Sequence, residues 1–392
     1  MRNLFDFATI RGFLRVAFFW RIWLFVCAFI ATAIFNKNDY PFPYTDSILL
    51  PTGLPKWIWG FANFDGVHYI RTALWGYVSE YSQAFFPLYP LTIRMLSFSN
   101  FGLPDQTIPL ISGLIISFFS FVGGSFFFYR IMQIDFKKEV SNRALWLFLF
   151  FPTSFYFVSL YTEGLFLLLS CGAIYLILKK YYLYAGILIA LATATRITGI
   201  FICLIFVIEL FKDLKNGKQT EKAVDLFPKL FGLFISVAGL VLYMFYLYYN
   251  YHNPLYFLTA QPVFGASRQV DQFVLLPQVF FRYLKILMTV PFFTSQFFSA
   301  IIELVFSLFG LFLLVISYKK VRFSFWIFSL CVYILPTLTG TLSSMPRYVL
   351  LLFLLFPAFS EFLSERTRFV LAILFGLQAL FTALFILGYW IA

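Results

Sequence analysis

Charged residues are scarce in this chain. Asp, Glu, Lys and Arg make up 12% of its 392 residues, whereas hydrophobic residues make up 61%. Soluble domains have about 25% charged and about 45–50% apolar residues, so this composition excludes an ordinary soluble protein. The apolar runs reach about 20 residues, enough for a membrane-spanning helix, and lack the alternation of membrane-spanning strands. The sequence therefore predicts an all-α fold, that of a polytopic helical membrane protein.

Several motifs are also missing. The four cysteines lie inside apolar runs and form no C-x-x-C pair, so neither a disulfide framework nor a zinc site is predicted. The chain has no D-x-D, H-E-x-x-H, G-x-x-x-x-G-K-[ST] or G-x-G-x-x-G sequence. Such motifs hold metals, metal-bound nucleotides or dinucleotides. We therefore expect no metal, no cofactor and no ATP-driven transport.

The positive charge has the pattern of membrane topology. The net charge is +12, but the basic residues stand at the ends of apolar runs instead of clustering in one patch. This arrangement does not predict a nucleic-acid partner. By the positive-inside rule, the face that carries most of the Lys and Arg is cytoplasmic. The arginine-rich N-terminal run resembles a signal peptide, but its length and the spans that follow favour an uncleaved signal anchor.

The apolar runs predict about 11 membrane-spanning helices in one integral membrane domain, residues 1–392. Two large loops, 36–106 and 251–294, are then extracytoplasmic. The helices around Arg196 are short, which indicates a broken or re-entrant pair. If 183–211 were instead one long tilted helix, everything after it would be inverted. The predicted helices are 12–35, 107–130, 142–158, 161–178, 183–196, 198–211, 229–250, 295–317, 323–340, 347–363 and 368–391.

A polar segment, 63–71, follows the first apolar run and contains Asp65, His68 and Arg71. Asp65 and His68 are three residues apart, so on a helix they share a face and could contact one ligand. An ionised carboxylate could accept a proton from a bound hydroxyl. The alternative is a solvated acid that caps a helix. The next segment, Gln83 to Pro90, has paired prolines and aromatics that indicate a shaped surface loop.

Three further charged residues map to the same predicted face. Glu163 lies in a turn between two apolar runs, where a carboxylate facing lipid would cost roughly 2.5–3.5 kcal/mol. Arg196 and Arg347 stand at predicted helix starts beside small hydroxyl residues and suit a buried anion such as phosphate. The alternatives are an interfacial turn acid for Glu163 and snorkelling to lipid headgroups for the arginines. His252 and Arg268 are weaker candidates for substrate contact.

Five segments along nearly the whole chain form one further pattern. They are Phe64–Ile70 with Trp75–Tyr77, Gln83–Pro90, Phe151–Ser154 with Tyr161–Glu163, Ala194–Gly199 and Met345–Tyr348. In this order they resemble the PIG-V-type mannosyltransferases. The family usually has Trp before the aspartate where this chain has Phe64. The chain is shorter than typical eukaryotic members, which favours a prokaryotic relative in a cell membrane.

The resemblance implies the GT-C glycosyltransferase architecture, with an extracytoplasmic active site and a polyprenyl or dolichyl monophosphate sugar, typically mannose, as donor. The acceptor would be a glycan, glycolipid or polymer; membrane lipids surround the protein, and a protein partner is possible. Asp65 matches the catalytic acid of the first outer loop. Phosphate would lie on Arg196 and Arg347, and substrate on the remaining predicted site residues, which are His68, Gln83, Tyr89 and Glu163.

Two other functional classes are compatible with a membrane protein of this composition. A lipid or sugar transporter or flippase would carry polar residues through the depth of several spans. Here only Glu209 and Glu303 come near such positions, so the sequence favours an enzyme. A scaffold subunit would leave the polar residues of the outer face unexplained, and alanine at Asp65 would then be harmless.

Overall fold

The structure is a computed structural model that describes residues 7, 9–35, 42–98, 102–216, 223–264, 268 and 274–391. It confirms the all-α membrane class. Helices dominate the described residues, and five apolar stretches are long enough to cross a membrane. The total of about 11 crossings stays a prediction, because the other apolar helices are shorter than 18 residues. The five stretches are Ile10–Ile34, Thr107–Asp135, Leu226–Tyr251, Ser295–Ser317 and Phe353–Ile386.

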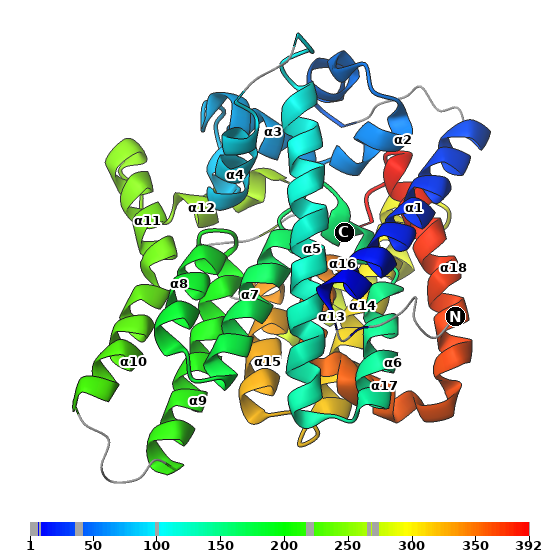
Figure 1. Ribbon diagram of the computed structural model, residues 1–392. Coiled ribbons are helices and arrows are strands. Elements are labelled where there is room, and N and C mark those ends of the chain that lie inside the picture. The colour runs from blue at the N-terminus through cyan, green and yellow to red at the C-terminus, as the bar shows by residue number, and fades with distance from the viewer. Residues whose placement is uncertain are drawn as a thin grey trace.

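The helices form a bundle around α5, which runs through the centre of Figure 1. With 29 residues, α5 is about 43 Å long and exceeds the roughly 30 Å hydrocarbon core of a bilayer. It packs against α7, α8 packs between α7 and α10, and α1 packs against α18. The long helices are α1 (Ile10–Ile34), α5 (Thr107–Asp135), α14 (Ser295–Ser317) and α18 (Thr367–Ile386).

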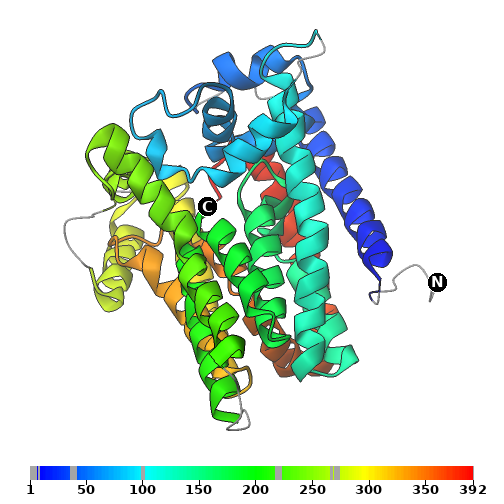
Figure 2. The ribbon, with the colours of Figure 1, turned by 60° about the vertical axis from the view of Figure 1, so that its left-hand side comes forward.

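Shorter helices fill the rest of the bundle. They are α6 (Lys138–Leu149), α7 (Glu163–Leu178), α8 (Tyr182–Thr193), α9 (Ile202–Asn216), α10 (Ala223–Ser236), α11 (Ala238–Tyr251), α15 (Phe323–Thr337), α16 (Met345–Leu350) and α17 (Phe356–Leu363). The short helices α2 (Lys56–Trp59), α3 (Asp65–Trp75) and α4 (Leu88–Leu96) lie together at one end of the bundle in both ribbon views (Figures 1 and 2). Two more, α12 (Tyr256–Thr259) and α13 (Leu276–Thr289), follow α11.

Three predicted helices are interrupted. The expected helix 142–158 ends at Leu149, and a 3₁₀ helix, Ser154–Val158, follows Pro152, because proline lacks the N–H that a continuing helix needs. The expected helix 347–363 divides into α16 and α17, and Pro357 stands at the start of α17. The expected helix 229–250 is α10 and α11, with a break at Val237.

The predicted break around Arg196 is confirmed. Helix α8 ends at Thr193, and a 3₁₀ helix, Ile197–Phe201, leads into α9. At Gly199 an added Cβ atom would lie 2.7 Å from the carbonyl oxygen of Ala192, so only glycine permits this close return of the chain. The single long helix 183–211 is thereby excluded, and Arg196 lies in the turn between two helices.

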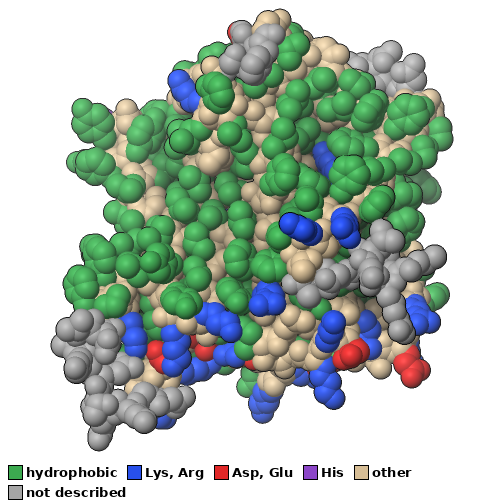
Figure 3. Space-filling view, viewed as in Figure 1, with side chains coloured by type: hydrophobic (Ala, Val, Ile, Leu, Met, Phe, Trp, Pro, Cys, Tyr) green, Lys and Arg blue, Asp and Glu red, His purple; other side chains and the backbone are tan. Residues whose placement is uncertain are grey.

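The surface separates charge from apolar side chains. In Figure 3 a broad hydrophobic band covers the visible face, and Lys and Arg gather along its lower edge. The C-terminal end of α9 lies at this basic end, whereas α3 and α4 lie at the opposite end (Figure 1). The orientation matches the charge asymmetry expected for a membrane protein, with a basic face on one side of the apolar band.

Candidate functional site

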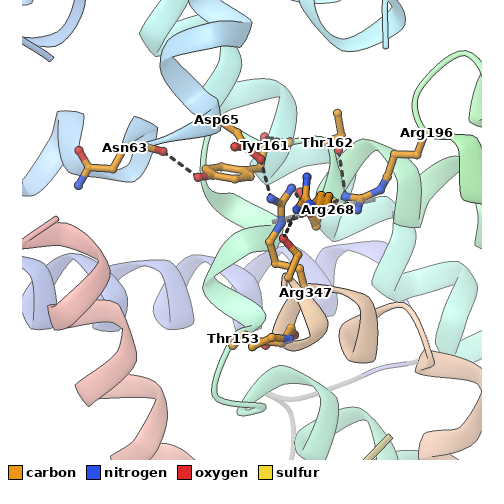
Figure 4. A network of polar contacts seen from close by, with 12 residues as sticks. Asn63, Asp65, Thr153, Tyr161, Thr162, Arg196, Arg268 and Arg347 are labelled. Carbon is orange, nitrogen blue, oxygen red and sulfur yellow. Dashed lines mark hydrogen bonds and ion pairs between the residues drawn. The ribbon is translucent and has the colours of Figure 1, made fainter. Parts of the chain in front are cut away.

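Four charged side chains that are remote in sequence meet at the end of the bundle where α3 lies (Figure 4). Arg347 Nη1 lies 2.5 Å from Asp65 Oδ2 and Nη2 lies 2.8 Å from Glu163 Oε1. The Nε atom of Arg347 donates to the same Glu163 oxygen at 2.9 Å. Arg196 Nη1 lies 2.5 Å from Glu163 Oε1 and donates to Thr162 Oγ1 at 3.1 Å. We call these four residues the outer ion cluster.

Burial differs within the outer ion cluster. The Glu163 side chain is fully buried, and the side chains of Arg347 and Arg196 are 7% and 12% exposed. Asp65, at 21%, is the most accessible of the four. Buried charges are costly unless they are paired and hydrogen-bonded, and here two cations meet two anions. Neither arginine has an acidic neighbour in the sequence, yet in the fold Arg196 pairs with Glu163, and Arg347 pairs with both Asp65 and Glu163.

The backbone before α3 determines where Asp65 points. Phe64 has φ 60° and ψ −115°, a conformation that costs a non-glycine residue about 1–3 kcal/mol. Its ring packs edge-on against Trp390, with centroids 5.0 Å apart. The Asn63 side chain donates to the carbonyl oxygen of Phe385 at 2.8 Å, and Tyr161 Oη donates to the Asn63 carbonyl at 2.7 Å. These contacts hold the strained turn, and Asp65 becomes the first residue of α3.

Glu163 is placed by the close approach of α7 to its neighbours. It is the first residue of α7, and a Cβ atom added at the next residue, Gly164, would lie 2.4 Å from the Phe157 carbonyl oxygen and 2.7 Å from that of Ser117. Only glycine fits there. One carboxylate oxygen of Glu163 holds both arginines, whereas the buried Oε2 has no hydrogen-bond partner among the described residues.

A cavity of about 140 Å³ opens beside the outer ion cluster, and we call it the arginine cavity. Asp65, Arg196 and Arg347 line it, together with Arg268 from the segment after α12. Arg268 donates to Gln261 Oε1 at 2.9 Å and to Ser344 Oγ at 3.3 Å, both neutral groups. Three guanidinium groups around one space suit a bound phosphate, because the planar guanidinium matches phosphate geometry.

An apolar cavity of about 480 Å³ is lined by residues that directly adjoin, in the sequence, residues that line the arginine cavity. Phe86 lines the arginine cavity and Pro87 lines the apolar cavity. In the same way, Thr195 lines the arginine cavity and Ala194 lines the apolar cavity. The apolar cavity is lined mainly by α4, α8 and α11. A ligand with a charged head and a hydrocarbon tail would match this adjacency.

His68 lies in an aromatic enclosure instead of the arginine cavity. Its ring stacks on Phe85, with centroids 4.8 Å apart, and meets Phe264 edge-on at 5.4 Å. Burial lowers the pKa of His68 to about 4, although Asp65 acts in the opposite direction. The imidazole is therefore neutral at pH 7. His68 lines a second, larger cavity that also reaches Asp65.

Two other predicted site residues lie outside the lining of these cavities. The Gln83 side chain is buried, and the backbone carbonyl oxygen of Gln83 accepts a hydrogen bond from the Tyr243 hydroxyl at 2.6 Å. Tyr89 is fully buried, donates to the Gly113 carbonyl at 2.9 Å and lies 2.7 Å from Ser117 Oγ. Both attach the first outer loop to the bundle. His252 ends α11 in a left-handed conformation, φ 54°.

Several residues that line the cavities could not be predicted with strength from local sequence patterns. Arg268 was a weak candidate, yet it is the third guanidinium of the arginine cavity. Trp390 lines two cavities that reach Asp65, but a tryptophan after an apolar helix carries no local signal. Glu303, an acid inside an apolar run, was the available sign that α14 contributes polar groups to the larger cavity.

The sequence of this chain is similar to that of known enzymes. The family model for mannosyltransferase (PIG-V) matches residues 11–265, more than half of the chain. The chain belongs to the PIG-V mannosyltransferase family. The matched region of this PIG-V family chain includes Asp65, Glu163 and Arg196, whereas Arg268 and Arg347 lie beyond it. No solved structure matches.

Curated relatives are distant. GPI mannosyltransferase 2 of Schizosaccharomyces pombe is 26% identical over 182 residues, 46% of this chain and 38% of that protein. GPI mannosyltransferase pigv-1 of Caenorhabditis elegans is 25% identical over 171 residues, 39% of this chain and 25% of that protein. The matches with these relatives therefore span well under half of their length.

Proposed function

We propose that this protein transfers a hexose, most simply mannose, from a polyprenyl or dolichyl monophosphate to an acceptor hydroxyl at the extracytoplasmic face of the membrane. The observation that carries the proposal is the position of Asp65, which lines a cavity together with three arginines. One group can accept a proton there, and the others can bind the phosphate of the donor. The PIG-V family match supports the choice of mannose.

The donor would lie across two adjoining spaces. Its phosphate would bind in the arginine cavity, and its hydrocarbon chain would occupy the neighbouring apolar cavity of α4, α8 and α11. Arg347 already holds Asp65, so an incoming phosphate would share this guanidinium and leave the carboxylate freer to act as a base. Glu163 would hold Arg196 and Arg347 in place through its ion pairs, without contacting the substrate.

The reaction would be a single inverting displacement. The acceptor oxygen forms a bond to the anomeric carbon while the bond from that carbon to the phosphate oxygen breaks. The acceptor proton passes to the Asp65 carboxylate, and the electron pair leaves on the polyprenyl phosphate, which the arginines stabilise. Proton transfer by a positioned carboxylate contributes typically about 10²–10⁴-fold in rate.

The orientation of the protein in the membrane follows from the distribution of Lys and Arg over its two ends. The basic end of the bundle would face the cytoplasm, and α3, α4 and the arginine cavity would face outward. A cell membrane of a prokaryote suits this arrangement, with the lipid-linked donor and the acceptor both on the outer side.

The test is sugar transfer from radiolabelled polyprenyl-phosphate mannose in membranes that express this chain, beside membranes that carry Asp65→Asn at equal expression. We expect the variant to lose about 10²–10⁴-fold in rate. Asp105→Asn is the matched control, because Asp105 is an exposed acid of the same outer loop. Equal transfer by wild type and Asp65→Asn would make Asp65 structural, and no transfer by either would favour a transporter.

A further inference from the structure

A second cavity of about 560 Å³ also reaches Asp65. It shares Asp65, Phe264 and Trp390 with the arginine cavity. The rest of its lining comes from α13, from α14, from the segment 340–343, and from Phe42, Phe64 and His68. Asp65 therefore stands at the boundary of two spaces that have different linings. One is lined by three arginines, and the other contains the carboxylate of Glu303 and a single arginine, Arg282. We call the second space the glutamate cavity.

Glu303 is an unusual residue for an apolar helix such as α14. Its side chain is only 8% exposed, and it has no ion-pair partner within 4.0 Å among the described residues. The Tyr283 hydroxyl donates to Glu303 Oε2, accepts from the Leu342 amide at 3.0 Å and lies 3.1 Å from Thr341 Oγ1. A carboxylate at this depth is normally paired, solvated or functional.

The chemistry of the glutamate cavity fits a sugar. A carboxylate is an acceptor-only group, so its free lone pairs suit hydroxyl donors. The rings of Phe42, Phe64 and Trp390 also line the cavity and offer flat apolar surfaces against a hexose ring. Asp65 lines both cavities, so a hydroxyl of a sugar bound in the glutamate cavity could reach its carboxylate.

The surface beside the glutamate cavity suits a lipid. Helix α13 and the start of α14 supply lining residues of the cavity. The end of α13, the turn that follows it and the first turn of α14 carry large exposed apolar side chains. An apolar aglycone attached to the sugar could extend from the cavity into the bilayer along these side chains. They are Met288, Phe292, Phe293 and Phe298, which are 85%, 73%, 88% and 50% exposed.

We propose that the glutamate cavity binds the acceptor as a glycoside with an apolar aglycone, and that Glu303 and Tyr283 hold its sugar hydroxyls while one hydroxyl reaches Asp65. This inference rests on the proposed transfer reaction. It assigns the donor to the arginine cavity and the acceptor to the glutamate cavity, so that Asp65 lies between them. Glu303 and Tyr283 are binding residues in this arrangement, and Asp65 alone moves the proton.

The experiment uses the full chain in detergent with radiolabelled polyprenyl-phosphate mannose and a panel of octyl hexosides beside matching methyl hexosides. We expect the octyl compounds to be the better acceptors. Glu303→Gln should raise the acceptor KM at least tenfold and leave the donor KM unchanged. Ser299→Leu, which narrows the cavity from α14 without removing a charge, should act in the same direction. Glu209→Gln is the control, because Glu209 is also 8% exposed but lies in α9, outside the glutamate cavity.

Each result bears on one claim. An unchanged acceptor KM in both cavity variants, or a raised donor KM instead, would overturn the assignment of the glutamate cavity. Wild type that consumes the donor but prefers methyl hexosides, or uses no octyl hexoside, would overturn the apolar aglycone. Wild type that neither consumes the donor nor labels any acceptor contradicts the transfer reaction itself, and this result is distinct from the other two.

Discussion

Two groups of ion pairs lie at opposite ends of the bundle, and their bond lengths are similar. In the outer ion cluster the N···O distances run from 2.5 to 2.9 Å. At the basic end Arg322 lies 2.6 Å from Asp135 and 3.2 Å from Glu209, which Lys212 meets at 2.7 Å. Distance therefore does not separate a candidate site from a structural contact.

The surroundings do separate them. At the basic end the side chains of Lys212, Arg322 and Asp135 are 47%, 28% and 27% exposed. In the outer ion cluster no side chain exceeds 21%. The outer ion cluster also faces a cavity with a third arginine. Charge that is buried, paired and open on one side to an enclosed space is poised to interact with a ligand, whereas exposed pairs are screened by water and salt.

The largest expected effect comes from breaking the outer ion cluster at its centre. Glu163→Gln keeps the shape of the side chain but leaves Arg196 and Arg347 buried with one carboxylate between them. Removing one partner of a buried pair costs about 3–5 kcal/mol. We expect a marked fall in melting temperature in detergent and the loss of transfer activity. A melting temperature equal to that of wild type would mean that water already solvates these charges.

The next effect concerns affinity for the donor. Arg268→Gln removes the guanidinium of the arginine cavity whose described partners are neutral. A hydrogen bond to a charged group contributes about 1.5–3 kcal/mol, so the donor KM should rise by about tenfold or more. Arg130→Gln, at an exposed position on α5, is the control for loss of one positive charge. An equal change in both variants would indicate general attraction of anionic lipid, not a phosphate site.

The same contrast explains how much the sequence could predict. Composition and apolar run length were sufficient for the membrane helical class, because crossing a bilayer leaves few alternatives to a helix. Segments 63–71 and 194–199 predicted Asp65 and Arg196 as site residues, and the break near Arg196 is confirmed. The pairing of Arg347 with both Asp65 and Glu163 could not be predicted, since it depends on how α3, α7 and α16 pack. The helix breaks at Pro152 and Pro357 were visible in the sequence, but their effect was missed.

His68 gives an effect that depends on pH. Its pKa in the folded protein is about 4, below the ordinary value of 6.5. Between pH 6.5 and pH 4 the unfolded chain binds a proton that the folded chain does not, so stability falls as the pH falls. The loss is up to about 1.4 kcal/mol for each pH unit in this window. The melting temperature of wild type should therefore fall more steeply from pH 7 to pH 5 than that of His68→Phe, which keeps an aromatic ring against Phe85. Parallel curves would show that other groups dominate.

The smallest effect is expected at the basic end. Asp135→Asn weakens a two-bond contact with Arg322, whose Nε and Nη2 atoms donate at 2.6 and 2.7 Å. Both side chains are more than a quarter exposed, and exposed pairs of this kind contribute about 0.2–1 kcal/mol. We expect a shift of melting temperature far smaller than for Glu163→Gln, which should shrink further at high salt, and unchanged transfer activity. Activity that fell as far as in Glu163→Gln would mean that the two clusters are coupled through the bundle, and burial beside a cavity would then no longer distinguish the candidate site.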